Sequence, residues 1–273
     1  MPSLAPGRRL ALTSPAMPVI CINGVSLEIH RESPCGDPQR APIVFLHEGL
    51  GSVAMWRDWP AAVCAATGRE GIVYSRRGYG ASEPVPDVRG TGRLRPHYMH
   101  DEAWKVLPAL LEALGVHSPV LLGHSDGGSI ALLHAARHPV AACVVMAPHV
   151  IVEDVSVRSI AQAREAFQEG DLRGRLARYH QDVDGAFWQW NDVWLSPEFR
   201  GFDIRAECRR ITAPLLAIQG EQDPYGTLAQ VREIAPTAGP LETMVVADCG
   251  HSPHRDQPPA VTRRIAQFLR TLP

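Results

Sequence analysis

Residues 119–137 read PVLLGHSDGGSIALLHAAR, an apolar run that passes through a glycine-flanked serine into a helix-like pattern. Ser125 stands two residues from a glycine on each side, Gly123 and Gly127. Gly-x-Ser-x-Gly alone is a weak signal, because a chance match in a chain this long is about a one-in-ten event. Between a buried strand and a helix, however, the turn strains the serine backbone, and its neighbours must be glycine to avoid collisions. The context predicts a sharp strand-to-helix turn that exposes the Ser125 hydroxyl at a helix N-terminus.

Further short runs resemble the apolar run before Ser125. They are branched and apolar on both faces, as buried parallel strands are, and comprise residues 42–47, 71–75, 142–147, 214–220 and 243–249. Two more runs, 18–22 and 25–30, flank Asn23-Gly24 and predict a hairpin. Helix-length stretches alternate with the strands, at roughly 52–67, 98–114, 127–137, 227–235 and 259–271. This alternation predicts an α/β fold, with a mostly parallel eight-stranded sheet and helices on both faces.

The alternation breaks at residues 152–205, which contain no strand-like run and hold nearly half of the aromatic residues. Ligands of open α/β sheets bind at the carboxyl edge of the strands, where an insertion of this kind can reach them. We therefore expect residues 152–205 to form an inserted helical lid, with some rings in its own core and others lining an apolar pocket. Trp188 and Trp190 are candidate substrate-binding residues. They cannot share one helix face, so one of them is expected to face the substrate.

The rest of the chain divides around this lid. Residues 1–16 contain prolines and no unbroken apolar stretch, and are predicted to be a disordered tail. Residues 17–151 and 206–273 are then the α/β core. Neither a signal peptide nor a 20-residue apolar span is visible, and the six cysteines include no CxxC pair. A reducing, cytoplasmic location is expected.

The charge and motif content narrow the possible partners. The formal net charge is −2 and the basic residues are scattered, which gives no reason to expect nucleic acid or a membrane. The sequence HSPH at 251–254 offers two histidines without the spacing or third ligand of a zinc site. No glycine-rich phosphate cradle is present. We expect a small-molecule substrate and no metal or cofactor, and the sequence does not indicate an oligomeric state.

Nearly the whole chain resembles the α/β-hydrolase superfamily. The resemblance is carried, in chain order, by FLHEGLGS (45–52), SRRGYGAS (75–82), GHSDGG (123–128), GEQDPYG (220–226) and CGHSPH (249–254). It implies the α/β-hydrolase fold, with Ser125 as the nucleophile on the nucleophile elbow. It also implies the chain order serine, acid, histidine for the three catalytic residues.

The base and the acid are assigned from position and from this resemblance. A serine hydroxyl needs a base within hydrogen-bond reach at neutral pH. His251 follows the last predicted strand in the Gly-His position of the family, and His254, three residues on, is its rival. The base in turn needs a carboxylate that fixes its tautomer. Asp223 follows the preceding strand, where the family carries its acid, and is favoured by location over Glu221 and Asp256.

An oxyanion hole is expected at two backbone amides. One donor is the N–H of Asp126, the residue after the serine. The second lies in the loop after His47, and its position indicates Gly49, with Leu50 as the alternative. Glu48 stands where glycine is frequent in the family, and is expected to brace the loop or to reach polar substrate atoms.

These residues predict a serine hydrolase that cleaves a carboxylic ester of a small to medium, largely apolar substrate. The alternatives are a carbon–carbon bond hydrolase of ring-cleavage products, a lactonase, a peptidase and, from another class, a non-catalytic ligand receptor. An aspartate nucleophile is disfavoured, because Asp126 follows the centre of the elbow instead of occupying it.

Overall fold

The computed structural model describes residues 18–32, 37, 39–270 and 272. The predicted tail at residues 1–16 lies outside the described residues. No helix in this described part combines the length and the apolarity that crossing a membrane requires.

Eight strands form one sheet, each where the sequence predicts a strand. They are β1 (Val19–Ile22), β2 (Val25–Glu32), β3 (Ile43–Leu46), β4 (Gly71–Tyr74), β5 (Val120–His124), β6 (Ala142–Met146), β7 (Leu215–Gly220) and β8 (Leu241–Val246). Their order across the sheet is β1-β2-β4-β3-β5-β6-β7-β8. The pairs β1–β2 and β2–β4 are antiparallel, and the pairs from β4 to β8 are parallel. The predicted α/β architecture is confirmed.

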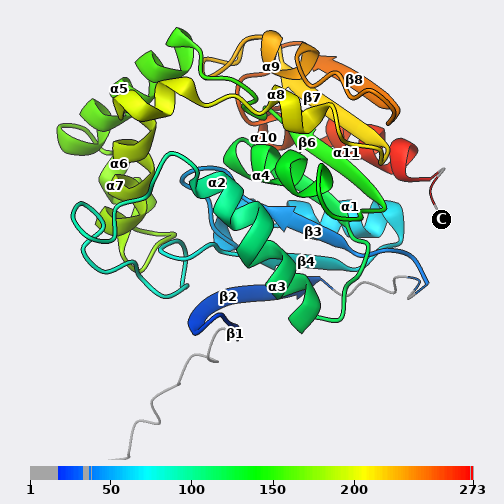
Figure 1. The fold of residues 1–273 in the computed structure, drawn as a ribbon, viewed down its shortest axis with the longest axis horizontal. Coiled ribbons are helices and arrows are strands. Elements are labelled where there is room, and N and C mark those ends of the chain that lie inside the picture. Colours follow the sequence, from blue (N-terminus) through cyan, green and yellow to red (C-terminus); the bar gives the residue numbers. More distant parts are fainter. Residues whose placement is uncertain (1–17, 33–36, 38, 271, 273) are drawn as a thin grey trace, which may run out of the picture.

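Helices cover both faces of the sheet (Figure 1). On one face, α1 (Trp59–Thr67) and α11 (Pro258–Leu269) pack against alternate strand residues such as Ile43 and Phe45. On the other face, α3 (Leu107–Ala113) and α4 (Asp126–Ala135) pack against Val44 and Leu46. Because side chains alternate along a strand, burial on both faces requires the continuous apolar runs seen in the sequence.

Three predicted helices, at 52–67, 98–114 and 227–235, differ in detail from the structure, and the last of them holds only the short α9 (Ala229–Arg232). The stretch 98–114 contains α2 (Tyr98–Asp101), the π-helical turn η2 (Glu102–Val106) and α3. The stretch 52–67 begins with the 3₁₀ turn η1 (Ala54–Trp56), and its α-helix starts only at Trp59, where Pro60 fits the first turn. A further core helix is α10 (Pro253–Asp256).

The segment between β6 and β7, which includes the predicted lid at residues 152–205, is helical. It contains α5 (Asp154–Gln168), α6 (Leu172–Leu176), α7 (Val183–Trp194), η3 (Pro197–Gly201) and α8 (Arg205–Cys208), and is called the insertion below. Figure 1 shows α5, α6 and α7 grouped on the side of the molecule opposite the C-terminal end. The ring of Phe167 on α5 stacks on Phe187 of α7, with centroids 3.7 Å apart, so the insertion has aromatic packing of its own.

Candidate active site

Ser125 sits in a strained turn between β5 and α4. Its φ of 54° and ψ of −120° lie in a region that L-residues rarely adopt. The turn is held by the Ser125 amide, which donates to the Met146 carbonyl at 2.9 Å. A Cβ on Gly123 would lie 2.2 Å from the Gly127 oxygen, and one on Gly127 would lie 2.0 Å from the Leu46 oxygen. Both glycines are therefore required by backbone atoms, as the motif predicts.

The structure brings Ser125, His251 and Asp223 into one hydrogen-bonded chain. The distance from Ser125 Oγ to His251 Nε2 is 2.9 Å, and His251 Nδ1 lies 2.8 and 2.9 Å from the two Asp223 oxygens. Burial raises the pKa of Asp223, but the hydrogen bond and charge of His251, together with the Tyr225 amide and His149, hold that pKa below its ordinary value. An ionised carboxylate only accepts hydrogen bonds, so Nδ1 carries the proton and Nε2 is free to accept from the serine.

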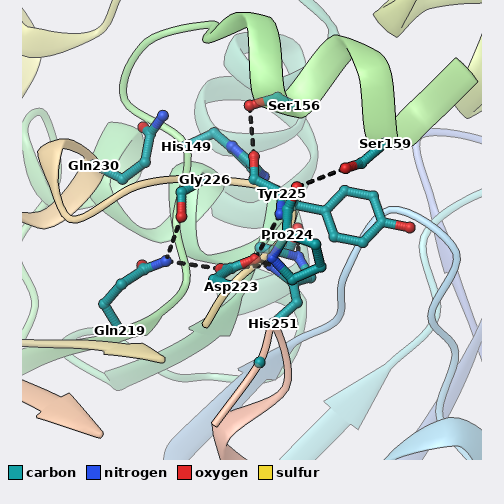
Figure 2. A network of polar contacts seen from close by, with 12 residues as sticks. His149, Ser156, Ser159, Gln219, Asp223, Pro224, Tyr225, Gly226, Gln230 and His251 are labelled. Carbon is teal, nitrogen blue, oxygen red and sulfur yellow. Dashed lines mark hydrogen bonds and ion pairs between the residues drawn. The ribbon is translucent and has the colours of Figure 1, made fainter. Parts of the chain in front are cut away.

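A buried glutamine, which the sequence reasoning missed, fixes the carboxylate of Asp223 (Figure 2). Gln219 Nε2 donates to Asp223 Oδ2 at 2.7 Å and to the Gly226 carbonyl at 3.2 Å. The Tyr225 amide donates to Oδ1 at 2.7 Å. The available signal was a polar residue at the end of the apolar run 214–220.

The loop that carries Asp223 is also tied to the insertion (Figure 2). Ser156 Oγ on α5 donates to the Tyr225 carbonyl at 2.5 Å, and Ser159 Oγ donates to the Pro224 carbonyl at 2.5 Å. These bonds join the first helix of the insertion to the loop that carries Asp223. No residue pattern in the sequence indicated this link.

The two amides predicted as oxyanion donors are unpaired in the described part of the chain. Neither the Gly49 N–H nor the Asp126 N–H has a hydrogen-bond acceptor there, and the same holds for Leu50. Asp126 is the first residue of α4, where helix amides point toward a ligand. A Cβ on Gly49 would lie 2.2 Å from Trp190 Nε1, so the glycine also makes room for the indole.

The side chain of Asp126 turns away from Ser125 into the core. It accepts a hydrogen bond from Tyr98 Oη at 2.5 Å, and its Oδ2 lies 3.8 Å from Arg76 Nη1. Trp194 Nε1 donates to the same tyrosine oxygen at 3.0 Å. Burial raises the pKa of Asp126. The backbone of Asp126 thus faces the site while its carboxylate braces Tyr98 and, through it, Trp194.

Glu48 braces the loop after β3. Its Oε1 accepts from Arg255 Nη2 at 2.9 Å, and its Oε2 lies 3.4 Å from His124 Nδ1. Burial raises the pKa of Glu48, but His124 and Arg255 lower it more, and the net pKa lies well below the ordinary value. His124 Nε2 in turn donates to the His251 carbonyl at 2.7 Å. Glu48 and His124 therefore support the backbone of His251.

A cavity of about 200 Å³ opens at Ser125. Its wall combines aromatic, aliphatic and polar side chains: Glu48, Gly49, Leu50, His124, Ser125, Asp126, His149, Ile160, Trp190, Trp194, Tyr225, His251 and Ser252. Four of the sequence-predicted site residues besides the serine are among them, namely Gly49, Asp126, Trp190 and His251. The structure places α7 over the cavity through Trp190 and Trp194.

Trp188, the other candidate substrate-binding tryptophan, does not line this cavity. Its indole packs edge-on against Phe167 and Phe187, with centroids 5.8 and 5.1 Å away, and under the Arg89 guanidinium at 4.1 Å. The reason is helix geometry, because residues two positions apart on α7 point to nearly opposite sides. Of the two tryptophans, Trp190 is the one that faces the cavity.

The rival acid and base residues lie elsewhere. His254 is buried beside the stacked rings of Trp56 and Trp59, with ring centroids 4.9 and 5.1 Å away, and makes no hydrogen bond to Ser125. Asp256 accepts from the Gly250 amide at 2.8 Å, and the side chain of Glu221 is exposed. None of these three is in the hydrogen-bonded chain of Ser125.

Comparison with known proteins places this geometry in a family. The sequence model described as "Alpha/beta hydrolase family" matches residues 43–264. The bifunctional esterase/perhydrolase DCH of Acinetobacter calcoaceticus is 31% identical over 166 residues, which span 56% of this chain and 55% of that protein. The 2-succinyl-6-hydroxy-2,4-cyclohexadiene-1-carboxylate synthase of an Enterobacter species is 26% identical, over 86% of this chain and 94% of the synthase.

A solved structure extends the likeness to the fold. The enol-lactonase of Burkholderia xenovorans LB400 superposes with a TM-score of 0.69 at 22% identity, over 93% of this chain and 100% of that one. At this identity the superposition speaks for the fold alone. The family match covers most of the sheet and every residue of the Ser125–His251–Asp223 chain. The protein therefore belongs to the alpha/beta hydrolase family.

Proposed function

We propose that this protein is a serine hydrolase that cleaves a small carboxylic ester through an acyl-enzyme. The observation that carries the proposal is the continuous chain from Ser125 Oγ through His251 to Asp223, with contacts of 2.8 to 2.9 Å. Nucleophile, base and orienting carboxylate in that order are what acyl transfer requires.

In the proposed mechanism, Ser125 Oγ attacks the ester carbonyl as His251 Nε2 takes the hydroxyl proton. The carbonyl oxygen becomes an oxyanion near the free amides of Gly49 and Asp126, and each such donor contributes about 3 kcal/mol to lowering the barrier. Collapse breaks the bond to the alcohol, which leaves with the proton from His251. Water then repeats the sequence on the acyl-enzyme, and releases the acid and free Ser125.

Asp223 holds the imidazole of His251 in the required tautomer and stabilises the imidazolium. Its depressed pKa keeps it ionised at neutral pH. The insertion would act as a lid, with Trp190 and Trp194 contributing apolar contact to the substrate. A cavity of about 200 Å³ has room for about seven water volumes, which suits a short acyl group.

The relatives lend support at a coarser level. The Acinetobacter relative is named as an esterase and perhydrolase, although the match spans 55% of that protein. The longer match is to a synthase. The same fold and catalytic residues could therefore cleave or form a bond other than an ester.

The test is a series of p-nitrophenyl esters from acetate to dodecanoate, with the wild type and Ser125→Ala. We expect turnover to be highest at two to six carbons and absent in the variant. A serine-directed phosphonate should label Ser125, as identified by peptide mass spectrometry. Failure with every ester, together with turnover of a vinylogous diketone, would replace the proposal with carbon–carbon bond hydrolysis.

A further inference from the structure

His149 lies on the loop that follows β6. Hydrogen bonds that do not involve its imidazole hold the backbone of this loop. The His149 amide donates to Ser129 Oγ at 2.9 Å, and that hydroxyl donates back to the His149 carbonyl at 2.7 Å. Ser129 belongs to α4, the helix that begins next to the proposed nucleophile. The ring can therefore be exchanged for another side chain while the loop keeps its hydrogen bonds.

The ring of His149 lies in the wall of the cavity at Ser125. Its centroid is 4.8 Å from that of Trp194 and 5.8 Å from that of His251. Only 2% of the residue is exposed. Figure 2 shows it beside the Asp223–His251 pair.

The imidazole nitrogens of His149 have no hydrogen-bond partner within the described residues, and Nδ1 is fully buried. Burial, aided by the neighbouring His251, lowers the pKa of His149 to about 3. The ring is therefore neutral at working pH, with one N–H donor and one acceptor nitrogen. Buried polar groups in native proteins are almost always satisfied, so a partner from outside the chain is called for.

We propose that His149 binds a neutral hydrogen-bonding group of the substrate, such as a hydroxyl, ether, carbonyl or amide, in addition to the scissile ester. The inference rests on the proposed function and narrows its substrate class to small esters with one further oxygen or nitrogen. An anionic group is disfavoured, because the ionised carboxylate of Glu48 faces the same cavity. The apolar walls of Trp190 and Trp194 would hold the remainder of the substrate.

The test compares pairs of esters that differ by one oxygen in place of a methylene. On the acyl side the pair is p-nitrophenyl methoxyacetate and butanoate, and on the alcohol side it is 2-methoxyethyl and butyl acetate. For each pair, the ratio of kcat/KM, polar over apolar, is measured in the wild type and in His149→Phe. Intrinsic differences in reactivity cancel when the variant is compared with the wild type.

We expect His149→Phe to lower that ratio about fivefold in at least one pair. A change of about fivefold is the effect expected from the loss of one neutral hydrogen bond. His149→Asn or His149→Gln, whose amides replace one ring nitrogen each, should restore part of the loss. If His149→Phe does not fold, His149→Leu makes the same comparison. Ratios unchanged in both pairs, with esters still cleaved, would overturn the inference and leave the proposed function standing.

A further comparison tests the charge of the bound group. Mono-p-nitrophenyl succinate and p-nitrophenyl 4-oxopentanoate have the same size, but only the first carries a carboxylate. After subtraction of spontaneous hydrolysis, the wild type should cleave the ketone ester faster. Faster cleavage of the succinate would overturn the neutral-group assignment. Failure to cleave any ester would instead refute the proposed function, and this inference with it.

Discussion

The α/β core and the insertion reach the same cavity by different means. In the core, a Cβ on Gly127 would lie 2.0 Å from the Leu46 carbonyl oxygen, which is a backbone atom in the sheet. At the insertion, a Cβ on Gly49 would lie 2.2 Å from the indole of Trp190, which is a side chain. A strand backbone cannot yield, whereas an indole can change its rotamer. The core thus fixes the proposed chemistry, and the insertion shapes the space around it.

Hydrogen bonds also connect the insertion to the core beside Asp223. Ser156 and Ser159 of α5 hold the carbonyls of Tyr225 and Pro224, next to Asp223. Displacement of α5 would remove two hydrogen bonds from the loop that carries the proposed acid. The insertion therefore also helps to hold the loop of Asp223 in place, and it does so through the backbone carbonyls of that loop.

The largest effect is expected where the core holds the nucleophile. Ser125→Ala should reduce ester turnover by about four orders of magnitude or more, because it removes the attacking oxygen. Alanine keeps the Cβ and so fits the same strained turn. The measurement is kcat/KM with p-nitrophenyl acetate, alongside thermal unfolding as the folding control. More than a few per cent of residual turnover would remove Ser125 as nucleophile.

The next largest loss of kcat is expected from changes to the proposed acid, Asp223, and the proposed base, His251. Asp223→Asn should lower kcat about a thousandfold to ten-thousandfold, because the amide can hold His251 in the wrong tautomer. His251→Ala should cost as much or more. His254→Ala is the matched control: its ring packs against two tryptophans, so stability should fall while kcat changes little. Similar kcat losses for both histidine variants would reverse the assignment.

The difference between core and insertion also explains what the sequence could predict. All eight strands and the positions of Ser125 and Asp223 follow from local pattern and motif, because a buried parallel sheet constrains composition along each strand. Gln219 and His149 escaped prediction because their roles depend on contacts that long-range packing creates. The choice between Trp188 and Trp190 stayed open because a helical period says which residues share a face without saying which face meets the cavity.

Acid should destabilise the folded protein through its buried histidines, including His134 in the core. Burial lowers the pKa of His180 in the insertion, and it lowers the pKa of His134, which is buried in α4, to about 4. Between pH 6.5 and 4 the unfolded chain binds a proton at this position and the folded chain does not, so stability falls as the pH falls. His134→Asn keeps a donor toward the Ala103 carbonyl without a titrating ring.

The free energy of unfolding, measured with urea at pH 7 and pH 5, should therefore drop about 2 kcal/mol less in His134→Asn than in the wild type. His180→Asn should change the drop in the same direction, because burial lowers the pKa of His180 as well. An equal drop in the wild type and in His134→Asn would show that the acid-sensitive groups lie elsewhere.

A smaller effect on catalysis is expected from the buried amide beside the acid. Gln219→Leu should lower kcat about tenfold with little change in KM, because Asp223 Oδ2 loses a neutral donor that positions it. Gln230 is the matched control, since this buried amide bonds to Val150 and Ile151 but not to Asp223. Gln230→Leu should lower stability without the selective loss of kcat. Equal kcat in Gln219→Leu and the wild type would contradict a positioning role.

The smallest effect should come from the insertion, where two neighbouring tryptophans allow a direct comparison. Trp190 lines the cavity and touches Gly49, whereas Trp188 packs on Phe187 and Arg89. Trp190→Ala should raise KM for p-nitrophenyl butanoate about threefold to tenfold more than for acetate, since the longer acyl group loses more apolar contact. Trp188→Ala should leave that ratio unchanged, even if it lowers the unfolding temperature. A ratio that moves equally in both variants, or in neither, would mean that the insertion does not set acyl selectivity and that the core shapes the pocket alone.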